Sequence, residues 1–407
     1  MAGRRSLGVV LSLVDAGGAA AASFFAGLVS LRTLSTNELA LYTLLFPAAL
    51  ALMLIPQTVA YLPQRLQINA QEAVTRPAYW GDSLRGAGLG AIVGLALPLA
   101  GLPLLGEVGV ASYAAVAVGA FAWVLTSPLQ DHVRAALHVT GHHGGAALVS
   151  AVNVTVTACA FLIIVAFDVR EVPFLAYAVL AAGNLVSAGA GILVHRHVAP
   201  TRDRVPITLR NATRYSSSAL VMQAAAYMNN LAIAIFLVPA ALAELEAARI
   251  AAQPVMVLGI GLSSYVLPLV IRARTSGDYL KARRDMAWFS GGVIGGGLVY
   301  SALLPFVVPV LSSIAQRAID LPLAIARSTS FALQSTSGPF NNLNLSAGMH
   351  KRAFWNSATT AALGIALNLI LIPIVGVYAL PISLAVAAAA RLGLGMRDLR
   401  RGPVPPG

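Results

Sequence analysis

Charged residues and cysteine are scarce in this chain of 407 residues. Only 10% of the residues are charged and 58% are hydrophobic, and the mean hydropathy is +0.78. A soluble protein of this length needs far more charge to cover its surface, so the composition predicts a polytopic membrane protein. Cys159 is the single cysteine and lies in an apolar run, which excludes a disulfide framework and a cysteine metal site within one chain.

Two common catalytic or nucleotide-binding patterns are also missing. The sequence contains no Walker-type GxxxxGK loop, so ATP is not expected to act on this chain directly. The metalloprotease pattern HExxH is absent as well, although histidines cluster at positions 132, 138, 142 and 143. We expect this cluster to be a solvated turn rather than a metal site, and we expect no cofactor.

The sequence contains an internal repeat. At a fixed offset of 207 residues, Gly141 aligns with Gly348 and His143 with His350, at the end of one apolar helix and the start of the next. The same offset aligns Pro47 with Pro254. Agreement of separate matches on one offset indicates two copies of one unit. We therefore predict an amino-terminal lobe at 1–205 and a carboxy-terminal lobe at 206–407.

Apolar runs long enough to cross a bilayer define an all-α fold. About twenty apolar residues are needed for each crossing, and we predict about twelve transmembrane helices in two six-helix repeats. The predicted helices cover residues 6–31, 39–62, 85–106, 110–138, 145–167, 172–195, 215–239, 246–271, 286–311, 320–346, 353–374 and 377–395. The first of these continues to Leu31, so we interpret it as a retained helix rather than as a cleavable signal peptide.

The basic residues orient these helices. With the amino terminus in the cytoplasm, 22 of the 27 basic residues fall in cytoplasmic segments, and both termini are then cytoplasmic. This distribution explains the net charge of +12 without a nucleic-acid partner. The abundance of Ala, Gly and Arg suggests a bacterial genome, so we expect the bacterial cytoplasmic membrane. The outer connections, such as those near Glu107 and Asp168, are too short to house a catalytic domain, and we do not expect an enzyme.

Asp15 is a carboxylate in the first predicted helix. It follows Arg5 by ten residues, or ~15 Å of helix rise, which would place it near the middle of the bilayer. Charge at this depth is costly. We expect Asp15 either to bind a proton or cation or to bond a neighbouring hydroxyl or arginine.

Two further helices carry polar stripes at helical spacing, which predict facing walls of a water-filled cavity. The alternative is hydrogen bonding that holds the bundle together. The stripes consist of Gln223, Tyr227 and Asn230 in helix 215–239, and of Arg249 and Gln253 in helix 246–271.

Arg327 lies in the most polar predicted helix, 320–346, which also contains Gln334. An arginine inside a span is costly unless it faces an anion, a carboxylate or water, so Arg327 is a candidate phosphate ligand. The alternative is that its long side chain reaches the outer surface, and the same ambiguity applies to Arg32 at the outer end of the first helix.

Several segments together resemble the multidrug/oligosaccharidyl-lipid/polysaccharide (MOP) exporter superfamily. They are TLSTNELALY after the first helix, an R-x-x-L-H-x-x-G turn beginning at Arg134, an N-x-N-L-S-A-G turn ending at Gly348, and a final LIPIVGVYALPISLAVAAA. The chain looks most like the polysaccharide-biosynthesis, or Wzx-type, flippases. The resemblance implies alternating access and passage of a polyprenyl-(pyro)phosphate-linked glycan across the bilayer, with polysaccharide-assembly proteins as further partners.

The resemblance implies substrate-binding roles for the polar residues of the predicted transmembrane helices. Arginines would meet the phosphate, and amides and a phenol would meet the sugars. The substrate-binding candidates are Arg32, Gln223, Tyr227, Asn230, Arg249, Gln253, Arg327 and Gln334. The main alternative is a cation-coupled multidrug (MATE-type) antiporter of the same superfamily, in which Asp15 would couple the ion. A membrane glycosyltransferase or polymerase ranks third, because the outer loops are short.

Overall fold

The structure is a computed structural model that describes residues 2–61, 79–139, 142–195 and 209–401. Within these ranges the chain forms helices and turns and no strand, which confirms the predicted all-α class. Contacts divide the chain into two compact units, Met1–Tyr227 and Met228–Gly407. The division falls inside a helix. The predicted lobe boundary at 205/206 lies outside the described residues and stays a prediction.

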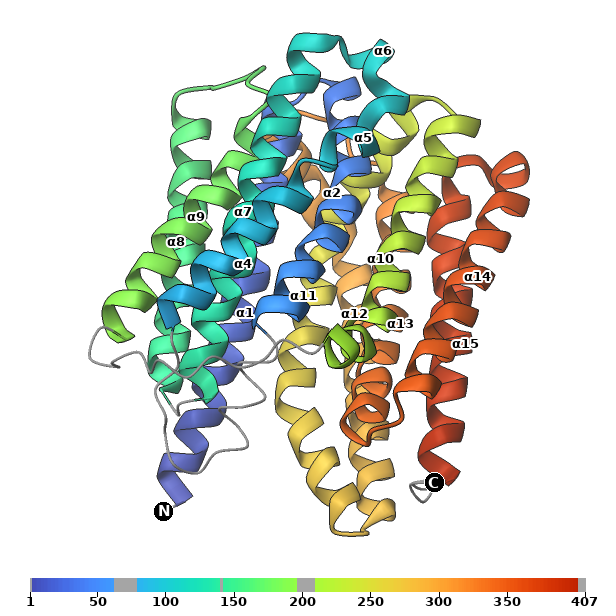
Figure 1. The fold of residues 1–407 in the computed structure, drawn as a ribbon. Coiled ribbons are helices and arrows are strands. Elements are labelled where there is room, and N and C mark those ends of the chain that lie inside the picture. The colour runs from blue at the N-terminus through green and yellow to red at the C-terminus, as the bar shows by residue number, and fades with distance from the viewer. Residues whose placement is uncertain (1, 62–78, 140–141, 196–208, 402–407) are drawn as a thin grey trace. The chain divides into compact units, whose positions relative to one another are not determined.

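Within the described residues, the first unit contains six long helical segments and the start of a seventh (Figure 1). They are α1 (Ala2–Thr33), α2 (Thr36–Pro56) with its π-helical end η1 (Gln57–Tyr61), a broken segment made of α4 (Tyr79–Gly94), α5 (Leu97–Gly101), η2 (Leu102–Leu104) and α6 (Leu105–Val108), then α7 (Val110–Val139), α8 (His143–Ala166) and α9 (Leu175–His195). The helix α10 (Leu209–Phe236) crosses into the second unit.

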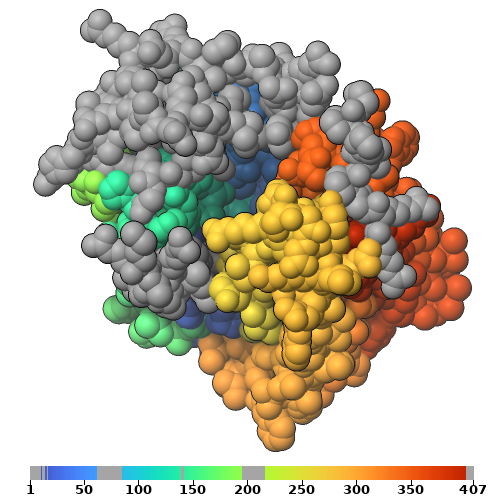
Figure 2. Space-filling view, turned by 90° about the horizontal axis from the view of Figure 1, so that it is seen from below, coloured from blue at the N-terminus to red at the C-terminus, as the bar shows by residue number. Residues whose placement is uncertain are grey.

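The second unit continues with five long helices. They are α11 (Pro239–Thr275), α12 (Tyr279–Ala315), α13 (Leu321–Ser346), α14 (His350–Val375) and α15 (Ala379–Arg401), with the short η3 (Gly376–Tyr378) before the last. The helices α11 and α12 are longer than predicted because their helical hydrogen bonding continues past the apolar core into basic residues. Their connecting turn, yellow in Figure 2, carries exposed Arg272, Lys281, Arg283 and Arg284.

Local sequence signals explain where helices begin and break. Ser35 caps α2 in a reciprocal box, because its hydroxyl accepts from the Glu38 amide (3.3 Å) and its own amide donates to the Glu38 carboxylate (2.8 Å). Asp320 caps α13 by accepting from the Leu323 amide at 2.8 Å. Prolines 98 and 103 cannot supply helical amide donors, and the segment predicted as one helix at 85–106 is broken into short pieces there.

The repeat is visible in the turns that precede α8 and α14. Both helices begin at a histidine, His143 and His350, which are 207 residues apart. The residues before them have nearly the same backbone angles, with φ −87° and ψ 57° in one turn and φ −82° and ψ 53° in the other. In each turn this residue donates its amide to the carbonyl five residues back, at 2.8 Å and 2.9 Å. The sequence repeat is therefore also a repeat of local structure.

Each unit has its own core. In the first, the rings of Tyr42 and Tyr177 lie 4.5 Å apart, and Trp123 stacks on Tyr177 at 5.4 Å. In the second, Met286, Phe289 and Phe340 belong to one buried cluster. Many large apolar side chains lie instead on the surface, which is expected where lipid is the solvent.

Nine stretches of the described residues are long and apolar enough to cross a membrane. The last of them, His350–Leu399, contains both α14 and α15, and neither α1 nor α13 is among the nine. Multiple spans are therefore shown by length and composition. The number twelve and the cytoplasmic position of both termini stay predictions.

Candidate functional site

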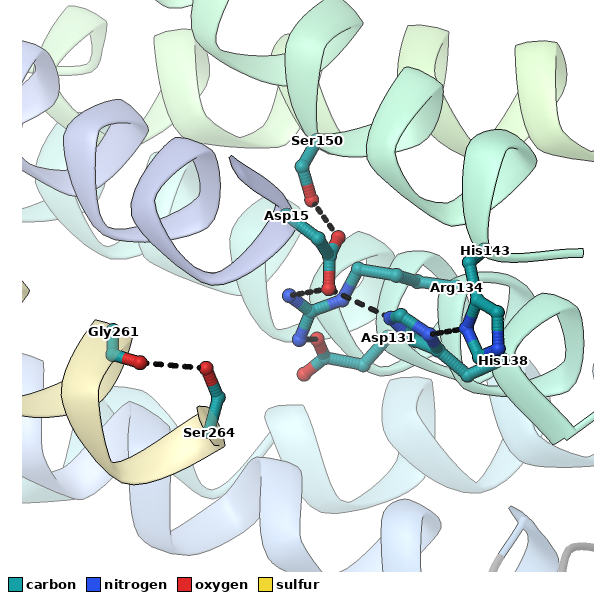
Figure 3. A network of polar contacts seen from close by, with 8 residues as sticks. All are labelled: Asp15, Asp131, Arg134, His138, His143, Ser150, Gly261 and Ser264. Atoms are coloured by element: carbon teal, nitrogen blue, oxygen red, sulfur yellow. Dashed lines mark hydrogen bonds and ion pairs between the residues drawn. The ribbon is translucent and has the colours of Figure 1, made fainter. Parts of the chain in front are cut away.

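Asp15 is the centre of a buried polar network in the first unit (Figure 3). Its side chain is 8% exposed. Ser150 of α8 donates its hydroxyl to one carboxylate oxygen at 2.5 Å. On the other oxygen, Nε2 of His138 lies at 2.8 Å and Nη1 of Arg134 at 3.5 Å, both from α7. The carboxylate of α1 thus connects three helices.

The network extends along α7 in both directions. Arg134 donates Nη2 to Asp131 at 3.0 Å, and Asp131 also accepts from Gln57 at the end of α2 (2.9 Å). On the other side, Nδ1 of His138 lies 3.2 Å from Nδ1 of His143, the first residue of α8. Positions 131, 134 and 138 are three and four residues apart, so they lie on one face of α7.

Asp15 lies in the middle part of α1, where it contacts His138, one residue before α7 ends. Its position near the middle of the bilayer stays a prediction. The expectation that the histidine cluster is a solvated turn is corrected by the structure. His132 is 1% exposed and stacks on Tyr61 at 4.3 Å, while His138 and His143 are half-buried.

Arg327 is one of the buried charged residues of the second unit. It is 7% exposed, and its Nε and Nη1 atoms have no hydrogen-bond partner among the described residues. Its guanidinium lies over the ring of Phe331, one helical turn on, at 5.1 Å. The charges of Arg249 and Glu246 on α11, which packs against α13, act on it. A buried guanidinium with unsatisfied donors is suited to an anion.

Arg249, like Arg327, was a predicted phosphate ligand, and the structure brings the two into one electrostatic environment. Arg249, however, is already paired, because its Nη2 and Nε lie 2.6 Å and 2.8 Å from the carboxylate of Glu246, which is 1% exposed. The i,i+3 spacing of the two residues in LAELEAARI is the sequence signal for this pair.

The remaining substrate-binding candidates are dispersed. Arg32 pairs with Asp168 at 2.7 Å, far along α1 from Asp15. Tyr227 is half-buried and donates its hydroxyl to the carbonyl of Ala100 at 2.9 Å, which favours a packing contact in the first unit. Gln334 donates to Ser330 of its own helix at 2.7 Å. Of the amides, Gln253 is buried, and Gln223 and Asn230 are half-buried.

Sequence reasoning missed a second carboxylate network. Asp398 of α15 is 9% exposed and accepts from Asn344 of α13 (3.1 Å) and Asn356 of α14 (2.9 Å), with Arg352 at 3.7 Å. Asp398 lies beyond the last predicted helix, 377–395, among basic residues that are typical of a cytoplasmic end. The helix continues to Arg401, which brings the carboxylate against its neighbours.

The candidate site residues form neither a metal site nor the lining of the described groove. Among the described residues, no three His, Cys, Asp or Glu side chains are grouped so that they could hold a metal ion. An open groove of about 440 Å³ lies along α7 and α9, and its lining of alanines, Val118, Gly119 and Phe174 is apolar. This groove could accommodate hydrocarbon but not a polar headgroup.

Comparison with known proteins shows the fold. No protein-family model matches the chain, and no curated protein sequence matches it significantly. Solved structures do match. An inward-facing multidrug resistance MATE family transporter of the MOP superfamily aligns with a TM-score of 0.63 and 14% identity, over 97% of this chain and 100% of that one.

Two further MATE structures align equally well. The Vibrio cholerae MATE transporter VcmN, in a mutant form, gives a TM-score of 0.64 at 15% identity over 98% of this chain and 99% of that one. The MATE multidrug transporter DinF-BH, in a ligand complex, gives 0.65 at 14% identity over 98% and 95%. The polytopic chain described above therefore has the fold of the MATE transporters of the MOP superfamily.

Proposed function

We propose that this protein is an alternating-access membrane transporter, not an enzyme, and that it moves an anionic lipid-linked glycan across the bacterial cytoplasmic membrane, as a Wzx-type flippase would. The observation that carries the proposal is the buried guanidinium of Arg327 with its unsatisfied Nε and Nη1. Burying such a group without hydrogen bonds costs several kcal/mol in an apolar medium. An anionic substrate that supplies the missing acceptors would offset that cost.

The buried carboxylates support an anionic rather than a cationic substrate. Asp15 faces Arg134 and His138, Glu246 is paired with Arg249, and Asp398 faces Arg352. The fourth, Glu38, serves the cap of α2. Within the described part of the chain, each buried acid is thus engaged by the protein, whereas a site for a cationic drug needs a carboxylate available to the ligand.

The chemical groups of a polyprenyl-(pyro)phosphate-linked glycan match the polar side chains of the second unit. Its phosphate would bind Arg327, and its sugars would meet amides such as Gln253 and Gln334 on the neighbouring helices α11 and α13. The hydrocarbon tail would stay in the lipid. Polysaccharide-assembly proteins are the partners expected on either side of such a step.

The proposal is tested by leaflet-resolved transport of a fluorescent polyprenyl-pyrophosphate oligosaccharide in proteoliposomes. We expect Arg327→Met to lower the initial rate at least roughly tenfold, which corresponds to loss of one charge-assisted contact. Arg272→Ala, which removes an equal charge from an exposed position in the same unit, should leave the rate unchanged. Equal rates for native protein and Arg327→Met would contradict the role of Arg327.

A second candidate is a cation-coupled multidrug antiporter. It is favoured by the MATE fold and by Asp15, whose carboxylate is buried within hydrogen-bonding distance of a titratable histidine. This function predicts ethidium efflux driven by a proton gradient and abolished by Asp15→Asn. Such efflux, together with an absence of lipid transport, would replace the flippase by the antiporter.

A further inference from the structure

Three titratable side chains form a continuous chain from the α7–α8 turn to the interior of the first unit. His143 is the first residue of α8, and exposed residues, His142 and Gly144, flank it. Its Nδ1 lies 3.2 Å from Nδ1 of His138, and Nε2 of His138 lies 2.8 Å from Oδ2 of Asp15. Figure 3 shows the two rings and the carboxylate in this order. Each step is within hydrogen-bonding reach.

The order of exposure matches the order of the chain. His142 and Gly144, which flank His143, are exposed, His138 retains 29% of its side-chain exposure, and Asp15 retains 8%. A proton from water therefore meets the histidines before it meets the carboxylate. Because Nδ1 of His138 faces His143 and Nε2 faces Asp15, one imidazole connects the two groups through its two different nitrogens.

We propose that His143 and His138 form a proton path that connects the aqueous α7–α8 turn to Asp15, which is the terminal acceptor. The inference rests on the proposed transport function for its purpose. Its geometry, however, lies entirely within the first unit. It assigns to two histidines a role that their position in a polar turn did not suggest.

The proposed transfer moves one proton in total, from His143 to Asp15. Protonated His143 gives its Nδ1 proton to Nδ1 of His138, and His138 gives its Nε2 proton to Oδ2 of Asp15. The result is a neutral His143, a His138 with its proton now on Nδ1, and a neutral Asp15 carboxyl. The reverse transfer restores the first tautomer, because it returns the Nε2 proton to His138 and the Nδ1 proton to His143.

The charged and polar groups around Asp15 determine how the helices respond to the proton. Asp131, Arg134 and His138 of α7 face Asp15 or its partners, and so do His143 and Ser150 of α8. Of these, His138, Arg134 and Ser150 interact with the Asp15 carboxylate directly. When Asp15 becomes neutral, Arg134 loses its partner at 3.5 Å and keeps Asp131 at 3.0 Å. The ionic contact between α1 and α7 is thereby weakened, so proton arrival changes how firmly α1 is held.

The second unit supplies a natural control. His350 begins α14 as His143 begins α8, at an offset of 207 residues. The position that corresponds to His138 is occupied by Leu345, and the position that corresponds to Asp15 by Met222. The turn is thus repeated, but the titratable groups beyond it are not.

The test is a pH jump on the purified full-length protein in detergent, with time-resolved infrared detection of the protonated carboxyl of Asp15. Asp15→Asn identifies the band. We expect His143→Gln to slow the appearance of that band by at least roughly tenfold, the scale of a lost proton-transfer group. The midpoint of the titration should stay unchanged, because His143 does not touch Asp15. His350→Gln should leave both rate and midpoint unchanged.

Two results would overturn the proton path. An unchanged rate in both His143→Gln and His138→Gln would overturn the path, since water would then reach Asp15 directly. A changed midpoint in His143→Gln with an unchanged rate would also overturn it, because the histidine would act only through its charge. The measurement needs no substrate. A failed lipid-transport assay with a slowed band would therefore reject the flippase and leave the proton path standing.

Discussion

Ser150 and Ser357 occupy the same place in the two repeats and bind side chains of opposite charge. Each lies seven residues after the first residue of its helix, α8 or α14, and each is fully buried. Ser150 donates to the carboxylate of Asp15 at 2.5 Å, whereas Ser357 accepts from Nη2 of Arg391 at 3.5 Å. The hydroxyl is therefore present in both repeats, but its hydrogen-bond partner is a carboxylate in the first unit and a guanidinium in the second.

This difference predicts unequal effects of the same substitution. Ser150→Ala removes a short bond to a buried carboxylate and should lower the free energy of unfolding by about 1.5–3 kcal/mol. Ser357→Ala removes a bond at the limit of hydrogen-bonding distance and should cost less than about 1 kcal/mol. Unfolding in detergent, followed by circular dichroism, compares the two. Equal losses would mean that the Ser150 contact is not a charge-assisted bond.

Replacement of Arg327 should separate stability from transport. Met has a similar length and no unsatisfied donors, so Arg327→Met should leave the free energy of unfolding unchanged or raise it by about 1 kcal/mol, while transport falls. The same unfolding assay and the transport assay check the two parts. A loss of more than about 2 kcal/mol would show that the guanidinium holds the fold together and would weaken its assignment to a substrate.

Asp168 should make the outer end of α1 sensitive to acid. The hydrogen bond from Arg170, with the charge of Arg32, holds the pKa of the exposed Asp168 carboxyl below its ordinary value of 3.8. Since the folded-state pKa is the lower one, the pairing stabilises the fold above pH 3.8 and is lost as the pH falls through the folded-state value. The Val172 amide, which donates to Thr33 at 3.2 Å, reports on this contact.

Hydrogen exchange at the Val172 amide provides the measurement. Exchange protection in the native protein should exceed that in Asp168→Asn at neutral pH and should fall to the level of the variant in acid. Asn is a suitable control because residue 168 has φ 48°, which Asn tolerates. A constant ratio between native protein and variant across the pH range would contradict the prediction.

Gly348 should be replaceable only by a residue that accepts a left-handed backbone. It has φ 74°, and a methyl group would meet no atom within 4 Å. The cost of Gly348→Ala is therefore conformational, about 1–2 kcal/mol, and Gly348→Asn should cost less. Thermal unfolding of the two variants distinguishes them. An equal cost would indicate a steric rather than a backbone origin.

Much of the fold could be predicted from the sequence because apolar runs and helix breakers are local. The predicted helix at 110–138 and the observed α7 at Val110–Val139 differ by one residue at the end. The first residues of α8 and α14, His143 and His350, are separated by the repeat offset of 207 residues. What failed was the extension of α11 and α12 past the apolar core, since charged residues end a predicted span but do not end a helix.

The site was predicted less well, because its contacts join distant positions. Asp15 was singled out by the cost of a buried charge, but His138 is 123 residues away, and no local pattern connects them. Arg327 was found for the same reason as Asp15. Its neighbour Arg249 was expected to bind substrate, and only the structure shows that its guanidinium contacts the Glu246 carboxylate at 2.6 Å and 2.8 Å.

The polarity of α13 has a consequence for biosynthesis. Its buried side chains include Arg327, Ser330, Ser337 and Asn341, and the helix is not among the nine stretches that are apolar enough to cross a membrane on their own. A nascent segment of this kind partitions poorly into lipid when it meets the translocon alone. We expect α13 to integrate only against α11 and α12, which emerge earlier and pack on it. The helix that supplies the candidate anion ligand thus depends on its neighbours even to enter the membrane.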